Sequence, residues 1–287
     1  MSAQLLEGKT IANQIKENLR AEIESLKQKT KLSPRLVSVQ VGDNSASAVY
    51  IKSQQKTAEA LGIEYKLETL DVNIMQQRLI GMIDELNQSD SVSGIIVQLP
   101  LPKGIDHKLV MSSIAPEKDA EGMHPENLGH VLLGDSQLAP CTAQASMELI
   151  DFTGVKLYGK EATIVGHSEI VGKPLSLLLL NKFVTTTVCH IATGERGILP
   201  EHVKRAEILV VAVGKAELIK GEWIKEGAIV VDVGINRAGD KIVGDVEFEK
   251  AKERAGFITP VPGGVGPLTV TMLMRNVVAA FKMQHKM

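Results

Sequence analysis

A turn between a predicted strand and a predicted helix carries residue types that bind phosphate. The apolar strand EATIVG runs into the turn GHSEIVGKP, residues 166–174, and an apolar helix follows. Such a turn points backbone N–H groups at a pyrophosphate. It departs from the usual dinucleotide fingerprint, because Ser168 holds the third position and Gly172 falls one residue late. A magnesium-binding phosphate loop is excluded, since Pro174 stands where that loop has Ser or Thr.

Two interpretations of this turn are open: a nucleotide site, or a plain connection between a strand and a helix. Two later strands end in VAVGKA and VDVGIN, which place Gly214 and Gly234 at carboxyl ends of the same sheet. Doubly wound folds bind their ligands at that edge, so the context favours the nucleotide site. His167 is in turn either a surface residue or a neighbour of the adenosine ribose.

Alternating helices and strands must position this turn. The apolar periodicity predicts helices over residues 8–29, 73–86, 143–151 and 268–286. It also predicts a helical segment that follows the strand 35–41 and ends at residue 60. It predicts strands over residues 35–41, 65–70, 94–99, 162–165, 186–189, 208–211 and 229–233. Strands that alternate with helices form parallel β-α-β units, with active residues at the strand ends.

The fold class that follows is α/β, with two α/β domains. The first covers residues 1–144 and receives the last helix, 268–287, which has apolar residues on more than one face. The second covers residues 145–267 and is a Rossmann-like, doubly wound parallel sheet. A chain of 287 residues with 44% hydrophobic content can bury a core in each domain.

The composition narrows the class of partner. The 32 basic and 34 acidic residues are well mixed, so we expect no nucleic acid or membrane partner and a small-molecule substrate. Cys141 and Cys189 lack the spacing of a disulfide framework or zinc site, and we expect no metal. The amino terminus has no cationic segment before a long apolar stretch, which predicts a cytoplasmic protein.

Seven collinear segments resemble the methylenetetrahydrofolate dehydrogenase/cyclohydrolase family in order and spacing, over nearly the whole chain. They are Val41 to Tyr50, VQLPLP (97–102), KDAEGMHP (118–125), PCT (140–142), GHSEIVGKP (166–174), VDVGINR (231–237) and TPVPGGVGPLT (259–269). The resemblance implies an enzyme that oxidises 5,10-methylenetetrahydrofolate with NADP or NAD, in a folate cleft between the two domains. It further implies a homodimer formed through the second domain and a place in one-carbon metabolism and purine biosynthesis.

The resemblance also implies roles for individual residues. Tyr50 would stack on or flank the folate, and Gln98 would orient the reacting carbon. The implied catalytic residues are Tyr50, Gln54, Gln98 and Glu121. The implied substrate-binding residues are Tyr50, Gln98, Leu99, Pro100, Glu121, Pro262 and Gly263. The implied cofactor-binding residues are Gly166, His167, Ser168, Ile191 and Ile235.

Position 54 departs from the family pattern, which has a lysine four residues after its tyrosine. Hydrolysis of the methenyl group needs proton transfers that an ammonium can assist and a neutral amide cannot. At about 100° per residue Gln54 shares a helix face with Tyr50, whereas Lys52 and Lys56 point away. Hydride transfer depends mainly on alignment, so we predict a dehydrogenase whose cyclohydrolase activity is weak or absent.

Two further positions depart from the pattern. Glu121 replaces an aspartate whose carboxylate would hydrogen-bond the pterin ring, and its extra methylene changes the alignment. Asp119 is expected to be a loop or capping residue. His167 replaces an arginine that pairs with the 2′-phosphate of NADP in many relatives, which weakens the expectation of NADP and makes NAD a credible cofactor. Two alternatives remain: a fully bifunctional dehydrogenase/cyclohydrolase, and a non-catalytic folate- or nucleotide-binding paralogue.

Overall fold

The computed structural model describes residues 2–43, 45–239 and 241–287. By its contacts the chain forms two compact units. Unit 1 comprises Met1–Asn13 and Thr142–Thr269, and unit 2 comprises Gln14–Cys141 and Val270–Met287. The predicted boundary near residue 144 lies close to the division at 141/142. The first residues differ, however, because a short amino-terminal strand pairs within unit 1.

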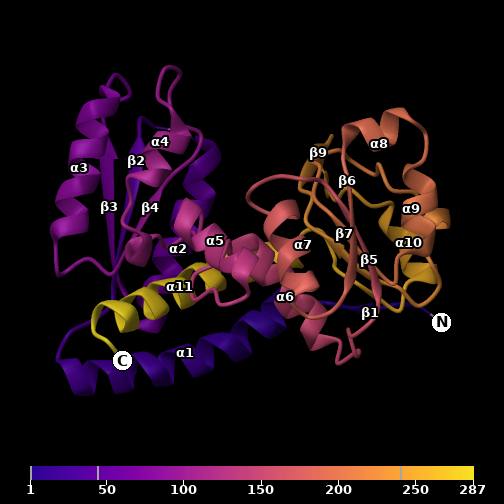
Figure 1. Cartoon of the computed structure of the whole chain (residues 1–287), viewed down its shortest axis with the longest axis horizontal. Helices are drawn as coiled ribbons and strands as arrows, with labels where there is room; N and C mark the ends of the chain where they lie inside the picture. The colour runs from indigo at the N-terminus through magenta and orange to yellow at the C-terminus, as the bar shows by residue number, and fades with distance from the viewer. Residues whose placement is uncertain (1, 44, 240) are drawn as a thin grey trace. The chain divides into compact units, whose positions relative to one another are not determined.

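Unit 2 is built on a three-stranded parallel sheet in the order β3-β2-β4 (Figure 1). Every residue of the central strand after Arg35 is buried. A parallel strand that is covered on both faces has this nearly continuous apolar character. Leu79 and Ile83 of α3 belong to the same core cluster as Val37 and Ile95 of the sheet. The elements named here are β2 (Arg35–Val41), β3 (Glu64–Leu70), β4 (Gly94–Val97), α2 (Ser45–Leu61) and α3 (Gln76–Gln88).

Short helices follow β4, and local side-chain contacts set their ends. Asp106 caps α4 by accepting hydrogen bonds from Lys108 N and Leu109 N. The helix α5 begins at Pro125, and Gly134 in the left-handed region terminates it. The elements are α4 (His107–Ser112), η1 (Pro116–Lys118) and α5 (Pro125–Leu133).

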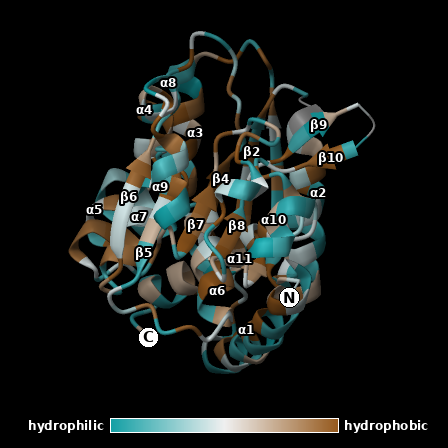
Figure 2. Cartoon of the chain, turned by 90° about the vertical axis from the view of Figure 1, so that its right-hand side faces the viewer, coloured by the Kyte–Doolittle hydropathy of each residue, from teal (hydrophilic) through white to brown (hydrophobic). Residues whose placement is uncertain are grey.

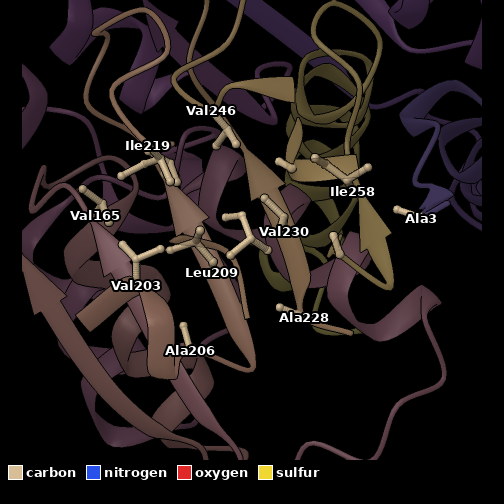
Figure 3. Packing of buried hydrophobic residues seen from close by; sticks show 14 of the residues in the cluster. Ala3, Val165, Val203, Ala206, Leu209, Ile219, Ala228, Val230, Val246 and Ile258 are labelled. Atoms are coloured by element: carbon tan, nitrogen blue, oxygen red, sulfur yellow. The ribbon is translucent and has the colours of Figure 1, made fainter. Parts of the chain in front are cut away.

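Unit 1 contains a six-stranded sheet in the order β1-β11-β8-β7-β5-β6, and all five neighbouring pairs are parallel. Figure 3 shows Val165, Leu209 and Val230 on neighbouring strands of this sheet, with Val203 of α9 in the same buried cluster. Figure 2 colours β7 and β8 as hydrophobic and the outer helix α10 as largely hydrophilic. The strands are β1 (Gln4–Leu5), β5 (Glu161–Val165), β6 (Thr185–Cys189), β7 (Ile208–Val211), β8 (Ile229–Asp232) and β11 (Phe257–Ile258).

Helices and a hairpin complete unit 1. They are α7 (Gly172–Leu180), α8 (Ile191–Glu195), α9 (Leu199–Arg205), η2 (Gly221–Trp223), α10 (Phe248–Arg254) and the pair β9 (Asn236–Ala238) and β10 (Lys241–Val243). Three further helices contain residues of both units: α1 (Gly8–Thr30), α6 (Cys141–Phe152) and α11 (Val265–Gln284). Within the described ranges, no helix is both long and apolar enough to cross a membrane.

The predicted α/β class with parallel sheets is confirmed. The predicted longer strands and helices are present, and most of their ends lie within about three residues of the expected positions. Two-residue strands such as β1 and β11 were missed, because two residues are too few to show a period.

Candidate active site

In the turn after β5, backbone oxygens approach two glycines so closely that no side chain would fit there. A Cβ on Gly166 would lie 2.3 Å from Ala212 O, and Gly166 has a φ of +119°. A Cβ on Gly172 would lie 2.0 Å from Gly166 O. Ser168 stabilises the middle of the turn, since its Oγ accepts a hydrogen bond from Val171 N at 3.1 Å. The late glycine thus serves close packing of the turn against the start of α7.

A cavity of about 740 Å³ opens at the carboxyl ends of β5, β6 and β7, and we call it the strand-end cavity. It contains four of the five predicted cofactor residues: Gly166, His167, Ser168 and Ile191. Ile235 is not among its lining residues and is 68% exposed. The glycine-shaped turn, the position at the strand ends and the size of the cavity fit a dinucleotide.

Two histidines face each other at the strand-end cavity. The ring centroids of His167, after β5, and His190, after β6, lie 5.4 Å apart. The charged residues Glu195 and Lys215 line the same cavity. The predicted nucleotide turn indicated His167, but sequence reasoning missed His190, because no motif marks the residue that follows β6.

Two buried aspartates hold the loops behind this cavity, and sequence reasoning missed both. The carboxylate of Asp245 accepts hydrogen bonds from the backbone N–H groups of Val213, Gly214 and Lys215 and from Asn236 Nδ2. Gly234 lets Asp245 approach, since a Cβ there would lie 2.2 Å from its carboxyl carbon.

The second aspartate, Asp232, accepts hydrogen bonds from the backbone of Gly234, Asp245 and Val246. Burial raises its pKa to about 6, although these donors act in the opposite direction. Because each carboxylate accepts several backbone N–H bonds, Asp232 and Asp245 hold the loops after β7 and β8 in place.

In unit 2 a buried cluster forms around Gln54, and we call Gln54, Gln98, Tyr65 and Ser38 the amide cluster. Gln54 is 0% exposed, and its Oε1 accepts hydrogen bonds from Tyr65 OH at 3.2 Å and Gln98 Nε2 at 3.1 Å. Gln98 Nε2 also donates to Ser38 Oγ at 2.9 Å. The Nε2 atom of Gln54 has no hydrogen-bond partner among the described residues.

Tyr50 and Glu121 lie beside the amide cluster. Burial, followed by the charge of Glu121, raises the pKa of the Tyr50 phenol well above its usual value, while the Gln54 side chain lowers it. Burial and the nearby charge of Asp119 raise the pKa of Glu121 to about 8. The four predicted catalytic residues Tyr50, Gln54, Gln98 and Glu121 therefore gather in one region of unit 2.

The carboxylate of Asp119 accepts hydrogen bonds within its own loop, as expected of a loop residue. Asp119 is 1% exposed and accepts hydrogen bonds from Gly122 N, His124 N and Asn127 Nδ2. These contacts fix the loop that carries Glu121.

Asn276 of α11 holds the same loop from the other side. Its Nδ2 donates to Ala120 O at 2.9 Å and Ala139 O at 3.0 Å. The sequence motifs did not point to Asn276, because it lies more than a hundred residues further along the chain.

Lys52, Lys56 and Lys118 do not provide an ammonium at Gln54. Lys52 and Lys56 are exposed, as their positions on the helix predict. Lys118 Nζ donates to the carbonyl oxygens of Leu86, Asn87 and Ser89 and so caps α3.

The remaining predicted substrate residues lie in loops of both units. Leu99 and Pro100 follow Gln98 in unit 2, are exposed and are joined by a cis peptide bond. Pro262 and Gly263 are exposed and follow β11 in unit 1. Among the residues that the structure describes, no group of three or more His, Cys, Asp or Glu side chains is placed to hold a metal ion.

Two family models match this chain. The tetrahydrofolate dehydrogenase/cyclohydrolase catalytic domain matches residues 6–121, and the NAD(P)-binding domain of the same family matches residues 140–285. The bifunctional protein FolD of Bacillus pumilus is 50% identical over 283 residues, with 98% of this chain and 99% of the relative covered. The FolD protein of Acetivibrio thermocellus is 50% identical over 288 residues, with both chains fully covered.

Solved structures agree with these matches. The crystal structure of the bifunctional enzyme FolD, methylenetetrahydrofolate dehydrogenase/cyclohydrolase, from Campylobacter jejuni has a TM-score of 0.94 and 44% identity, and covers 98% of this chain and 99% of its own. The Trypanosoma brucei FolD structure, a complex with NADP cofactor and inhibitor, has a TM-score of 0.95, 37% identity and full coverage of both chains. The chain therefore belongs to the tetrahydrofolate dehydrogenase/cyclohydrolase family, with one region that matches its catalytic domain and one that matches its NAD(P)-binding domain.

Proposed function

We propose that the chain is an NAD(P)-dependent methylenetetrahydrofolate dehydrogenase in which hydrolysis of the methenyl product is weak. The observation that carries this proposal is the buried Gln54, beside Tyr50, at the position where the family pattern has a lysine. Its Oε1 accepts two hydrogen bonds, so the amide is held in one orientation with Nε2 as its remaining donor.

The oxidation step depends mainly on the alignment of the folate with the nicotinamide. The nicotinamide group, when bound, supplies the hydride acceptor, and the residues of this chain bind and orient the folate. Gln98 suits this role because Ser38 and Gln54 hold its amide, while its backbone N–H donates to Val39 O at 2.8 Å. A preorganised amide can position the one-carbon unit without changing its own protonation state.

The hydrolytic step needs proton transfer as well as alignment. Water must lose a proton as it attacks the methenyl carbon, and the nitrogen that leaves must gain one. Gln54 can donate a hydrogen bond from Nε2, but it cannot exchange a proton near neutral pH. The phenol of Tyr50 is held in its neutral form, because burial raises its pKa well above the usual value. Proton transfer at this position is therefore slow.

Glu121 is proposed to bind the pterin ring as a neutral acid. Burial first, and the charge of Asp119 second, raise its pKa to about 8, so the protonated form predominates at neutral pH. A protonated carboxyl group can donate one hydrogen bond and accept another. It can therefore pair with the adjacent donor and acceptor atoms of a pterin edge.

The bifunctional alternative is favoured by the names of the relatives from Bacillus pumilus and Acetivibrio thermocellus, both called bifunctional. It requires a proton carrier other than residue 54. The non-catalytic alternative is favoured by the three altered positions Gln54, Glu121 and His167.

One pair of assays separates the three functions. The purified chain is supplied with 5,10-methylenetetrahydrofolate and either dinucleotide, and the reduced nicotinamide and the methenyl product are followed separately by absorbance. We expect reduction of the dinucleotide with accumulation of the methenyl product. Rapid loss of that product would favour the bifunctional enzyme, and no reduction of either dinucleotide would favour the non-catalytic protein.

The variant Gln54→Lys tests the role of the amide, with Gln55→Lys as its matched control on the exposed face of the same helix. We expect Gln54→Lys to raise methenyl hydrolysis by a factor on the order of 10² or more. The control should leave both activities unchanged. A hydrolysis rate that Gln54→Lys does not alter would contradict the proposal.

We further propose a cytoplasmic homodimer that serves one-carbon metabolism and purine biosynthesis. Support for a dimer comes from β6, which ends the sheet of unit 1, and from exposed apolar side chains in the same unit. Tyr158 and Phe183 are 68% and 70% exposed, with ring centroids 5.5 Å apart. Sedimentation of the chain at several concentrations tests this proposal.

A further inference from the structure

The backbone on either side of Glu121 is held by close contacts within unit 2. Before it, Ala120 N donates to Ile95 O of β4 at 3.2 Å. After it, Gly122 has a φ of +71°, and a Cβ there would lie 2.3 Å from the carbonyl carbon of Ala139. The segment that carries Glu121 is therefore packed directly against the stretch of chain that leads into α6.

A single amide group joins these two backbone segments. Asn276 of α11 is 1% exposed, and its Nδ2 donates to Ala120 O at 2.9 Å and to Ala139 O at 3.0 Å. These two bonds can use both hydrogens of the NH₂ group. Asn276 Nδ2 also lies 3.5 Å from Cys141 Sγ, and the Cys141 thiol donates to Ala120 O at 3.4 Å. The carbonyl groups of Ala120 and Ala139 thus share one donor group from a distant helix.

We propose that Asn276 is a positioning residue for folate, which fixes through the Ala120 and Ala139 carbonyl groups the place from which the Glu121 side chain reaches the pterin ring. The inference rests on the proposed role of Glu121 in binding that ring. Asn276 acts through the backbone, so its effect does not require contact with the substrate.

A glutamate depends on its backbone more strongly than an aspartate does. Its side chain has one more rotatable bond, so a small change of the backbone at residue 121 moves the carboxyl group further. A displacement of about 1 Å can lower a catalytic rate by a factor on the order of 10². The extra methylene that separates Glu121 from the family pattern therefore increases the need for a fixed backbone.

Removal of the Asn276 amide would weaken the link between the two segments. Ala120 O would then depend on the Cys141 thiol, and a thiol is a weak donor. Ala139 O would lose its bond to the amide. Both alanines are buried, and a buried carbonyl group that loses its donor is costly unless it moves toward another. Such a movement shifts Ala120 and, with it, the neighbouring Glu121.

Binding of tetrahydrofolate tests the inference independently of turnover. Tetrahydrofolate, kept reduced, is titrated calorimetrically into the full chain and into its variant Asn276→Ala. We expect the variant to raise the dissociation constant about tenfold, because the pterin partner is displaced. The dissociation constants of NAD and NADP should not change, since Asn276 lies in unit 2. In steady-state assays the KM for the folate should rise and kcat should fall, with the KM for the dinucleotide unchanged.

Two further variants separate positioning from folding. Asn276→Ser keeps one donor at this position, so it should weaken tetrahydrofolate binding only about threefold, and it replaces Asn276→Ala if that variant does not fold. Val278→Ala removes a buried apolar side chain that lies about 200° around the same helix from Asn276. It should lower stability and leave the affinity for tetrahydrofolate unchanged.

A double variant tests whether Asn276 acts through Glu121. In the unmodified background Asn276→Ala should lower the dehydrogenase kcat/KM for the folate about tenfold. In the Glu121→Ala background the same change should lower it by less than about twofold, because two residues that act through one contact are not additive.

Two results would overturn the inference. If folded Asn276→Ala is less stable but binds tetrahydrofolate as the unmodified chain does, the amide only supports the fold. If Asn276→Ala lowers kcat/KM by the same factor in both backgrounds, Asn276 does not act through Glu121. If the unmodified chain does not bind tetrahydrofolate, the proposed function itself fails, and the inference fails with it.

Discussion

The hydroxyl group of Tyr65 donates a hydrogen bond to Oε1 of Gln54 at 3.2 Å, across from the bond that Gln98 Nε2 makes to the same atom. An amide whose oxygen accepts two donors cannot rotate without breaking both. Tyr65 therefore determines which end of the Gln54 amide is presented to Tyr50. Tyr65 lies on β3 and is half-buried, so it acts on the site through Gln54.

The variant Tyr65→Phe tests this positioning role. Removal of the hydroxyl leaves Gln54 Oε1 with one donor, which should lower the free energy of unfolding by about 1 kcal/mol. The dehydrogenase kcat should fall about three- to tenfold with little change in KM for the dinucleotide, because alignment in unit 2 is disturbed. Steady-state kinetics and urea unfolding measure both effects.

Tyr158→Phe is the matched control, since Tyr158 lies in unit 1, outside the amide cluster. It should leave kcat unchanged. An unaltered kcat in Tyr65→Phe, despite lower stability, would show that Tyr65 supports only the fold.

The raised pKa of Glu121 predicts a pH-dependent stability. Burial is the main cause, and it holds the folded-state pKa at about 8, well above the unfolded value. Between these two values the folded protein retains a proton that the unfolded chain has lost. The stability of the chain should therefore decrease as the pH rises through this window, and the loss should be complete above the folded pKa.

Glu121→Gln should remove this decrease, because a neutral amide does not have to be protonated. Melting temperatures at about pH 5.5 and pH 8.5 compare the variant with the unmodified chain, and the variant should be relatively more stable at the higher pH. Glu126→Gln, at an exposed position, is the control. Equal pH dependence in all three proteins would show that Glu121 is solvated and charged.

The turn before α7 predicts a selective loss of nucleotide binding. In Gly172→Ala the new Cβ would meet Gly166 O at 2.0 Å, so the turn must open. We expect the dissociation constants of NAD and NADP to rise by a factor on the order of 10². Binding of a folate analogue to unit 2 should change little.

Gly81→Ala provides a comparison at a helical glycine with no heavy atom within 4 Å of the added Cβ. It should preserve nucleotide affinity and increase stability slightly, because alanine favours a helix over glycine. Nucleotide affinity that survives Gly172→Ala would mean that the pyrophosphate binds elsewhere.

The sequence predicts most of the fold because apolar residues recur at a helix or strand spacing within each of the longer elements. The apolar runs of β2, β7 and β8 have the character of parallel strands buried on both faces. The two-residue strands β1 and β11 show no period, and their pairing joins segments about 250 residues apart. Such pairing is decided by the tertiary structure.

The residues of the candidate site also fall into those that the sequence predicts and those that it does not. Motifs and helix periodicity found Tyr50 and Gln54, since four residues separate them on one helix. Tyr65 and Asn276 were missed, because their importance lies in a partner from another element: Gln54 for the first and the Ala120 carbonyl for the second. No local pattern encodes such a contact.

Asp245 carries the last prediction. Its Oδ2 accepts hydrogen bonds from Val213 N and Gly214 N, and its Oδ1 accepts from Lys215 N and Asn236 Nδ2. In Asp245→Asn one of these oxygens becomes an NH₂ group that faces two donors. A buried donor left against other donors costs about 1–3 kcal/mol, and the charge that strengthened the remaining bonds is also lost.

We expect Asp245→Asn to lower the free energy of unfolding by about 3 kcal/mol and to weaken dinucleotide binding, because Val213 and Lys215 line the strand-end cavity. Chemical denaturation and calorimetric titration with NAD measure the two effects, with the exposed Asp84→Asn as control. If stability falls while nucleotide affinity is retained, the loop after β7 keeps its shape without the carboxylate. In that case the close approach of Gly234 to residue 245 suffices to hold the cavity wall.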